Sequence, residues 1–336
     1  MTTAKVDPLY VGLDVGGTNM KAGVVDDSGT PLSGVSLPTE AHRGQDFGLG
    51  RMCETIREAV AAAGVGMERI SAIGVATPGS MDIPAGMILK SVNMPWVNVP
   101  VRRHVQETFG LPTAFQNDAN AAAYGEFWAG AGRGARSMVL FTLGTGVGGG
   151  IIVAGDDGGL VIEGEHSHGG EIGHIKIEMT RPRSCGCGGS GCLEAYASAT
   201  AVAKRAREAL AEDGGRSALH GVLRSGNELT SRHVFDAAAV GDELAGRIVE
   251  ETALYLAVGA TSLMHVIDPD LIVFGGGMIA AGDGFLDRIR GHVRRLAFPV
   301  PAERTRIVYA RLGGDAGFIG AAACGRRLVR EKISRL

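Results

Sequence analysis

Short apolar runs that end at glycine-rich turns recur along this 336-residue chain. Runs at 9–15, 22–26 and 70–76 predict buried strands, because each is short and bounded by turn residues. Longer stretches carry apolar residues at helical spacing, which predicts helices at 46–63, 101–109, 242–266, 283–296 and 315–334. Strands that alternate with helices indicate an α/β protein.

The same pattern covers the rest of the chain. It predicts one helix at 193–211, a loop at 213–232, and strands at 138–143, 271–274 and 305–310. Residues 112–115 are extended, and the polar Gln116, Asn117 and Asp118 precede an alanine-rich run. Asn117 or Asp118 is therefore expected where a strand ends and a helix begins.

Two parts of the pattern match each other. Residues 9–29 and 138–158 each hold an apolar run, a Gly/Thr turn, a second apolar run and an acidic turn. This weak internal repeat predicts two related halves. The turn at 144–150 also satisfies G-x-G-x-x-G, but a dinucleotide-binding fold needs a helix next, and the apolar residues 151–154 predict a strand. We therefore reject a Rossmann fold.

Composition narrows the class of protein. The chain is 45% hydrophobic, so it can bury a substantial core, and its net charge of −3 disfavours a nucleic-acid partner. No apolar stretch approaches the roughly 18 residues of a membrane span, and the N-terminal residues do not resemble a secretory segment. The expected location is the cytoplasm, with no membrane partner.

Three cysteines, Cys185, Cys187 and Cys192, lie close together on a glycine-rich loop. Thiolates on such a loop suit Zn²⁺, which takes four nitrogen or sulfur donors in a tetrahedron. The alternative is a reactive or disulfide-forming cluster, although a disulfide is disfavoured in a cytoplasmic protein.

The loop supplies only three donors, so a fourth must come from elsewhere. His174 is the leading candidate, because Glu171 and Glu194 bracket the same segment, and His166 and His168 are its rivals. A metal there would join a strand end that carries Glu171 and His174 to a helix start that carries Glu194.

Three glycine turns follow strands, at 16–18, 144–150 and 275–277. Backbone N–H groups without a neighbouring Cβ suit phosphate oxygens, and Thr18 and Thr145 can add hydroxyl donors. Asp14 ends the first strand, where a carboxylate can hold Mg²⁺ through water. The alternative is that the glycines merely permit tight hairpins.

Asp118 is the best candidate for a general base, since phosphoryl transfer to an alcohol needs a carboxylate that accepts the hydroxyl proton. The alternative is a plain helix N-cap. The amide of Asn117 could hold a sugar hydroxyl as donor and acceptor, and Glu171, His174 and Glu194 could add further contacts. Asn93 is either another contact or a loop cap.

Together these residues resemble the ROK family of repressors and sugar kinases, and its glucokinases most of all. The matching segments occur in family order along nearly the whole chain: LDVGGTNMKAGVVD at 13–26, QNDANAAAYGE at 116–126, LGTGVGGG at 143–150, GGEIGH at 169–174, CGCGGSGCLEAYAS at 185–198 and FGGGM at 274–278.

The resemblance implies an α/β protein with the actin-like ATPase (ribonuclease H-like) fold, whose two domains hold the active site in a cleft between them. A small domain would contain 1–118 and 316–336, and a large domain 119–315. The family usually forms homodimers or homotetramers.

The resemblance also implies the roles of individual residues. Asp118 would be the base toward the sugar 6-hydroxyl, and Mg²⁺ would lie near Asp14. The sugar contacts would be Gly79, Asn93, Asn117, Asp118, Glu171, His174 and Glu194. The ATP contacts would be Gly16, Gly17, Thr18, Thr145, Gly146, Gly276 and Gly277. A structural Zn²⁺ would bind His174, Cys185, Cys187 and Cys192, so that the two ring nitrogens of His174 serve sugar and metal.

The resemblance implies ATP-dependent phosphorylation of a hexose, most closely glucose to glucose 6-phosphate. A fructokinase and an N-acetylmannosamine or N-acetylglucosamine kinase are the alternatives within the class. A sugar-responsive repressor of the same family is disfavoured, because the first strand begins near Leu9 and leaves no room for a helix-turn-helix. One departure from the family pattern is His166 and His168, just before the sugar segment.

Overall fold

The computed structural model describes residues 7–91, 93–155 and 158–334. Contacts divide the chain into two compact units, one of residues 1–135, 150–170 and 311–336, and one of residues 136–149 and 171–310. Residues 119–135 and 150–170 belong to the first unit in this division, whereas the sequence predicts them in the large domain. The reason is packing, because α3 (Asp118–Ala129) lies along α11 (Ala316–Ser334) within that unit.

A five-stranded sheet forms the centre of the first unit. Its order is β3 (Val35–Pro38), β2 (Asn19–Asp26), β1 (Leu9–Val15), β4 (Ile70–Thr77) and β8 (Thr113–Asn117). β4 pairs in parallel with both β1 and β8. The carboxyl ends of these three strands therefore share one edge, which places Asp14 and Asn117 at the same edge of the sheet.

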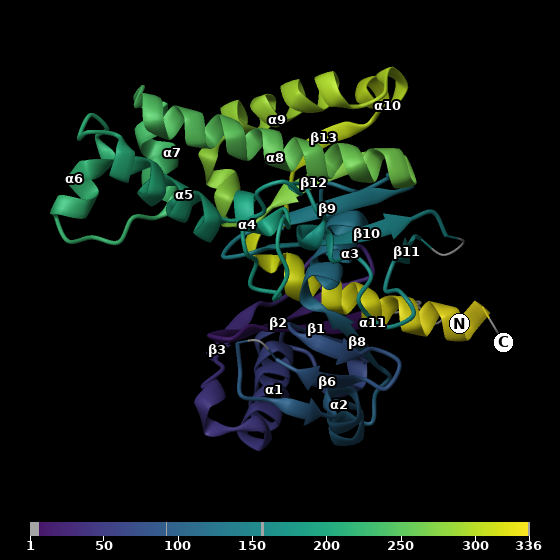
Figure 1. The fold of residues 1–336 in the computed structure, drawn as a ribbon. Coiled ribbons are helices and arrows are strands. Elements are labelled where there is room, and N and C mark those ends of the chain that lie inside the picture. The colour runs from purple at the N-terminus through teal and green to yellow at the C-terminus, as the bar shows by residue number, and fades with distance from the viewer. Residues whose placement is uncertain (1–6, 92, 156–157, 335–336) are drawn as a thin grey trace. The chain divides into compact units, whose positions relative to one another are not determined.

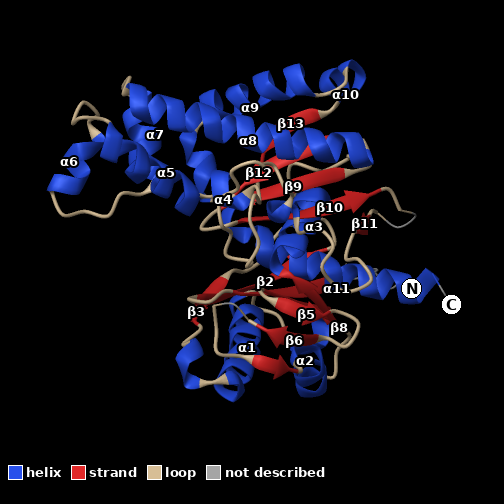
Figure 2. Cartoon of the chain, in the orientation of Figure 1, coloured by secondary structure: helices blue, strands red, loops and turns tan. Residues whose placement is uncertain are grey.

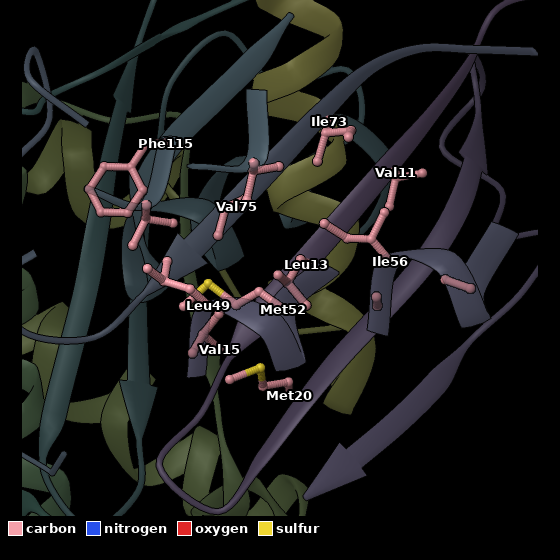
Figure 3. Close-up of a cluster of buried hydrophobic side chains, with 14 of the residues drawn as sticks. Val11, Leu13, Val15, Met20, Leu49, Met52, Ile56, Ile73, Val75 and Phe115 are labelled. Atoms are coloured by element: carbon pink, nitrogen blue, oxygen red, sulfur yellow. The ribbon is translucent and has the colours of Figure 1, made fainter. Parts of the chain in front are cut away.

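Helices cover both faces of this sheet (Figure 1). α1 (Gln45–Ala62) and α2 (Val101–Phe109) lie on one face, and α11 lies on the other. In the core, Leu49, Met52 and Ile56 of α1 pack against apolar residues of the strands, among them Leu13 and Val75 (Figure 3). This core forms because the inward positions of α1 recur at helical spacing.

Smaller elements complete the first unit. Three short strands, β5 (Ser80–Asp82), β6 (Met87–Lys90) and β7 (Val97–Val99), form a separate sheet that the sequence pattern did not predict. Single 3₁₀ turns lie at Ala41–Arg43, Met67–Arg69 and Gly313–Asp315.

The second five-stranded sheet has the order β11 (Leu160–Val161), β10 (Val147–Val153), β9 (Met138–Leu143), β12 (Leu271–Gly275) and β13 (Arg306–Tyr309). The boundary between the units falls inside β10. In each sheet the strands follow the order third, second, first, fourth and fifth of their set. This identical order confirms the predicted repeat.

Helices make up most of the second unit (Figure 2). The long α8 (Glu243–Ile267) packs against α9 (Asp283–Leu296) and α7 (Ser231–Ala239). The remaining helical segments are α4 (Glu194–Ala197), α5 (Ala199–Glu212), α6 (Leu219–Arg224), α10 (Pro299–Arg304) and the 3₁₀ turns η3 (Ile172–His174) and η4 (Gly277–Ala281).

Four local predictions need correction. The helix expected at 193–211 is two helices, because Ser198 is extended and its hydroxyl caps α5 by accepting from the Ala201 N–H at 3.1 Å. The loop expected at 213–232 contains α6 and the start of α7, and β10 begins at Val147 inside the expected turn. The segment that carries Glu171 and His174 is a 3₁₀ turn and not a strand end.

Two further points concern the limits of these elements. Asp156 and Asp157, part of the second predicted acidic turn, lie outside the described residues. Among the helices that the structure describes, none combines the length and the apolar character of a bilayer-crossing segment.

The close approach of β1 to α11 gives a test of the first unit. A methyl group on Gly12 would lie 1.7 Å from the carbonyl oxygen of Phe318, so Gly12→Ala should lower the unfolding free energy by about 1–3 kcal/mol. Gly50→Ala is the control, because nothing lies within 4 Å of its Cβ position in α1. That change should raise the unfolding free energy by about 0.5–1 kcal/mol. Urea unfolding measures both, and equal midpoints for the two variants would contradict the packing described.

Candidate functional site

The junction between β8 and α3 determines how the candidate base is presented. Asn117 is the N-cap of α3, and its Oδ1 accepts from the N–H groups of Ala119 at 2.9 Å and Asn120 at 3.1 Å. Asp118 is the first residue of the helix, and its Oδ1 accepts from Ala119 N–H at 2.8 Å. The N-cap role weighed for Asp118 therefore belongs to Asn117. Because the cap occupies the Asn117 oxygen, its Nδ2 is the atom left to contact a ligand.

Asp14 lies near Asp118 at the same edge of the sheet. Burial, with a further contribution from the negative charge of Asp118, raises the pKa of Asp14 to about 7, while Lys21 opposes the shift. Gly317 in the first turn of α11 makes room for this carboxylate, since a Cβ there would lie 2.1 Å from Asp14 Oδ2. Two carboxylates this close are a place where a divalent cation would relieve their repulsion.

The first glycine turn is fixed by hydrogen bonds at Gly16, whereas its tip is exposed. Gly16 N–H donates to Asn19 O at 2.9 Å, and Thr39 Oγ1 donates to Gly16 O at 2.6 Å. Gly17 and Thr18 at the tip are exposed. These contacts fix the turn while leaving its tip accessible to an anion.

Two of the predicted sugar contacts lie in the loops around this edge. The Cβ of Asn93 lies 3.3 Å from the position that a Cβ on Gly17 would take, so Asn93 borders the first turn. Gly79 follows β4 with a φ of 109°, and a Cβ there would lie 2.6 Å from Lys90 O. Glycine is required at this position by both the backbone conformation and the space.

In the second unit, the turn at Gly144–Gly146 is braced by α5. Ala199 N–H donates to Gly144 O, and Thr200 Oγ1 donates to Thr145 O at 2.9 Å. Thr145 itself is exposed. The third turn is similar, because Gly276 (φ 87°) and Gly277 are exposed and a Cβ on Gly276 would clash with Leu143 O at 2.4 Å.

Glu194 connects the second turn to the cysteine loop. Its Oε2 accepts from Val147 N–H at 3.0 Å, and its Oε1 accepts from the Cys185 thiol at 3.4 Å. A Cβ on Gly146 would lie 2.4 Å from Oε2, so the absence of a side chain on Gly146 makes room for Glu194. Gly146 therefore has a packing role that the sequence did not reveal.

The four predicted metal ligands come together. One donor atom from each of His174, Cys185, Cys187 and Cys192 lies within 4.8 Å of every other. Two ligands about 2.3 Å from one zinc ion at a tetrahedral angle would lie roughly 3.7 Å apart. The observed separations are 3.7 Å for Cys185 Sγ and His174 Nδ1, and 3.8 Å for Cys187 Sγ and Cys192 Sγ. The donor set and its spacing fit Zn²⁺.

The two ring nitrogens of His174 have different neighbours. Nδ1 points to Cys185, whereas Nε2 lies 4.0 Å from the Glu171 carboxylate. Glu171 is exposed, so one side of the ring faces the thiols and the other an accessible carboxylate. This arrangement agrees with a histidine that uses both nitrogens.

Protonation of the thiols differs along the loop. Burial raises the pKa of Cys185 to about 12, whereas a hydrogen bond from the Gly189 backbone lowers the pKa of Cys187. Lys176, which the sequence analysis missed, donates to Cys192 Sγ at 2.9 Å and to Ser190 O at 2.7 Å. An ammonium group beside a thiolate offsets part of the negative charge of a Cys₃His site. Its position two residues after His174 was the only signal in the sequence.

The rival histidines are placed differently. Among the described residues, the metal-binding group includes neither His166 nor His168. His168 Nε2 lies 3.2 Å from Ser80 Oγ, and its Nδ1 lies 2.6 Å from His166 O. His168 therefore ties its own loop to β5 in the first unit.

Comparison with known proteins supplies an independent line of evidence. The ROK family model matches residues 10–327. The glucokinase of Halalkalibacterium halodurans is 37% identical over 94% of each chain. The solved ROK hexokinase of Thermus thermophilus has 35% identity and a TM-score of 0.80, covering 96% of this chain and 99% of that one. The ROK glucokinase of Streptomyces griseus, solved with glucose and AMPPNP, has 33% identity and a TM-score of 0.77, covering 95% and 99%. These structures confirm the predicted actin-like ATPase fold.

The raised pKa of Asp14 predicts a pH-dependent stability. The folded state binds this proton up to about pH 7, against an ordinary value of 3.8, so the unfolding free energy should fall as pH rises between the two values. Since one pKa unit equals about 1.4 kcal/mol, the loss is at most about 4 kcal/mol. Asp14→Asn removes the ionisation, and its advantage over the parent should grow from pH 4 to pH 7. Denaturant unfolding in the presence of a chelator measures this, and a constant difference across that range would contradict it.

Proposed function

The chain belongs to the ROK family, and from that premise we propose that it is an ATP-dependent glucokinase, which converts glucose to glucose 6-phosphate. The observation that carries the proposal is the junction at Asn117. The amide caps the helix, and a carboxylate follows it at the sheet edge that also carries Asp14. Phosphoryl transfer to an alcohol needs this combination of a base and a nearby centre for charge neutralisation.

In the proposed reaction, Asp118 accepts the proton of the sugar 6-hydroxyl as the hydroxyl oxygen attacks the γ-phosphorus of ATP. The bond from that phosphorus to the bridging oxygen breaks, and ADP leaves with the electron pair. Gly17, Thr18, Thr145, Gly276 and Gly277 are exposed residues of the turns, and their N–H groups would hold phosphate oxygens and the nucleotide. Bound Mg²⁺ would neutralise phosphate charge, and Asp14 is the residue proposed to hold it.

The sugar would be held by contacts from several segments, among them Gly79, Asn93 and the Nδ2 group of Asn117. Glu171 would accept hydrogen bonds from vicinal hydroxyls, and His174 would donate one. Glu194 is also proposed to contact the sugar, although its oxygens already bind Val147 N–H and the Cys185 thiol.

His174, Cys185, Cys187 and Cys192 are proposed to hold a structural Zn²⁺. The ion would fix the imidazole through Nδ1, and this would leave Nε2 beside Glu171 for the sugar. The segment around the cysteines has few buried apolar residues of its own, so the ion would supply the order that packing does not.

Asp118→Asn tests the proposed base. The amide cannot accept the proton, so kcat for glucose should fall by about 100- to 10,000-fold. Glucose binding, measured by calorimetry, should stay within about threefold, since one hydrogen bond changes only its acceptor strength. A variant that turns over at the parental rate would remove Asp118 from this role.

A panel of sugars tests the proposed substrate. Coupled assays with glucose, fructose, N-acetylmannosamine and N-acetylglucosamine should give the highest kcat/KM for glucose. A preference of about a hundredfold for another of these sugars, which corresponds to roughly 2.7 kcal/mol, would move the protein to that kinase class.

Removal of the metal tests the zinc proposal. Chelation should make 171–198 susceptible to proteolysis and weaken glucose binding by at least about tenfold, while ATP binding changes little.

Because the Cys185 thiol must lose its proton to bind a metal, zinc affinity should fall as pH is lowered from 8 to 6.5. Elemental analysis gives the zinc content, and unchanged glucose affinity in metal-free protein would contradict the proposal.

The assembly is also proposed on family grounds. We expect a homodimer or homotetramer, and sedimentation of the purified chain distinguishes these from a monomer.

A further inference from the structure

Glu163 is not among the candidate site residues described above. It is hydrogen-bonded to Gln116, the residue that precedes Asn117 and the proposed base Asp118. Gln116 Nε2 donates to Glu163 Oε1 at 2.7 Å. Both residues belong to the first unit. Gln116 is 3% exposed, whereas Glu163 is half-buried, so the bond is partly buried.

The contact fixes which way the Gln116 amide faces. A carboxylate only accepts, so the amide NH₂ must face Glu163 and the amide oxygen must face the other way. That oxygen accepts from Asn117 N–H at 2.8 Å and, at 3.5 Å, from Asn120 Nδ2. Asn117 in turn caps α3 and sets the position of Asp118. A continuous chain of hydrogen bonds thus runs from Glu163 to the start of α3.

Glu163 also begins the loop that leads to Glu171. Within the first unit, this loop is tied by Ile83 N–H, which donates to Ser167 Oγ at 3.0 Å, and by Ser80 and His168 at 3.2 Å. The bond from Gln116 is the third tie, and of these three it is the one that reaches Asn117. The two histidines that depart from the family pattern belong to the same anchored loop.

We infer that Glu163 and Gln116 form a positioning pair that holds Asn117 and Asp118 in register with the loop that precedes Glu171. Neither side chain touches substrate. The inference rests on the proposed function, because it assigns the pair to the placement of the proposed base.

Exchange of the two side chains is the sharpest test. In Gln116→Glu the two carboxylates face each other, so kcat for glucose should fall by roughly 10- to 100-fold, as expected for a displaced catalytic group. In the double variant Q116E/E163Q, the amide at 163 donates to the carboxylate at 116, which still accepts from Asn117 N–H. The double variant should recover to within about threefold of the parental kcat.

Two single substitutions of Glu163 distinguish the effect of its hydrogen bond on kcat from the effect of its charge. Glu163→Gln keeps an acceptor for the Gln116 amide and should retain kcat within about threefold, whereas Glu163→Leu removes it and should lose roughly tenfold. The KM for ATP should stay unchanged in both variants. Glu165→Leu is the matched control, because it removes an exposed carboxylate from the same loop and should leave kcat unchanged.

Melting temperatures of all variants identify any that fail to fold. If the double variant folds but stays as slow as Q116E, or if Q116E and E163L keep full activity while Asp118→Asn is inactive, the positioning inference is wrong and the proposed function stands. If Asp118→Asn is itself active, the proposed base is wrong instead.

Discussion

The cap at Asn117 is the contact on which the candidate chemistry depends. Asn117 lies where the parallel strand β8 ends and α3 begins. Its amide oxygen accepts hydrogen bonds from two backbone N–H groups in the first turn of α3. The Asp118 carboxylate follows at the first helical position, where its Oδ1 also accepts from Ala119 N–H at 2.8 Å. It lies near Asp14 at the shared edge of β1, β4 and β8.

In the second unit, side-chain hydrogen bonds connect the cysteine loop to its neighbouring segments. Glu194 joins the turn at Val147 to the thiol of Cys185, and Cys185 lies against the imidazole of His174. Lys176 adds a positive charge at Cys192. The four residues proposed to bind zinc therefore belong to a wider polar network, and the network reaches the glycine turn proposed to contact phosphate.

The two sheets share one strand order, and this explains why glycine turns recur in the chain. Each half begins with a hairpin whose turn is exposed and whose surroundings leave no space for a side chain at one glycine. The second half has no counterpart of the Asn117–Asp118 junction in its sequence, because the strand at 306–309 is followed by Ala310 and Arg311. The halves thus keep a common framework while they place different chemistry on it.

Periodicity and turn residues in the sequence determined the central strands, the long helices and the repeat, since these depend on local spacing. The cysteine loop and its family resemblance also predicted the four residues proposed to bind Zn²⁺. Tertiary structure decided the rest. Ser198 separates two helices where the sequence pattern predicted one, and α3 packs on α11 within the first unit. Glu163, Lys176 and the capping role of Asn117 also emerged only in the fold. A side chain's partner depends on groups distant in sequence, and no local pattern records which of them it will meet.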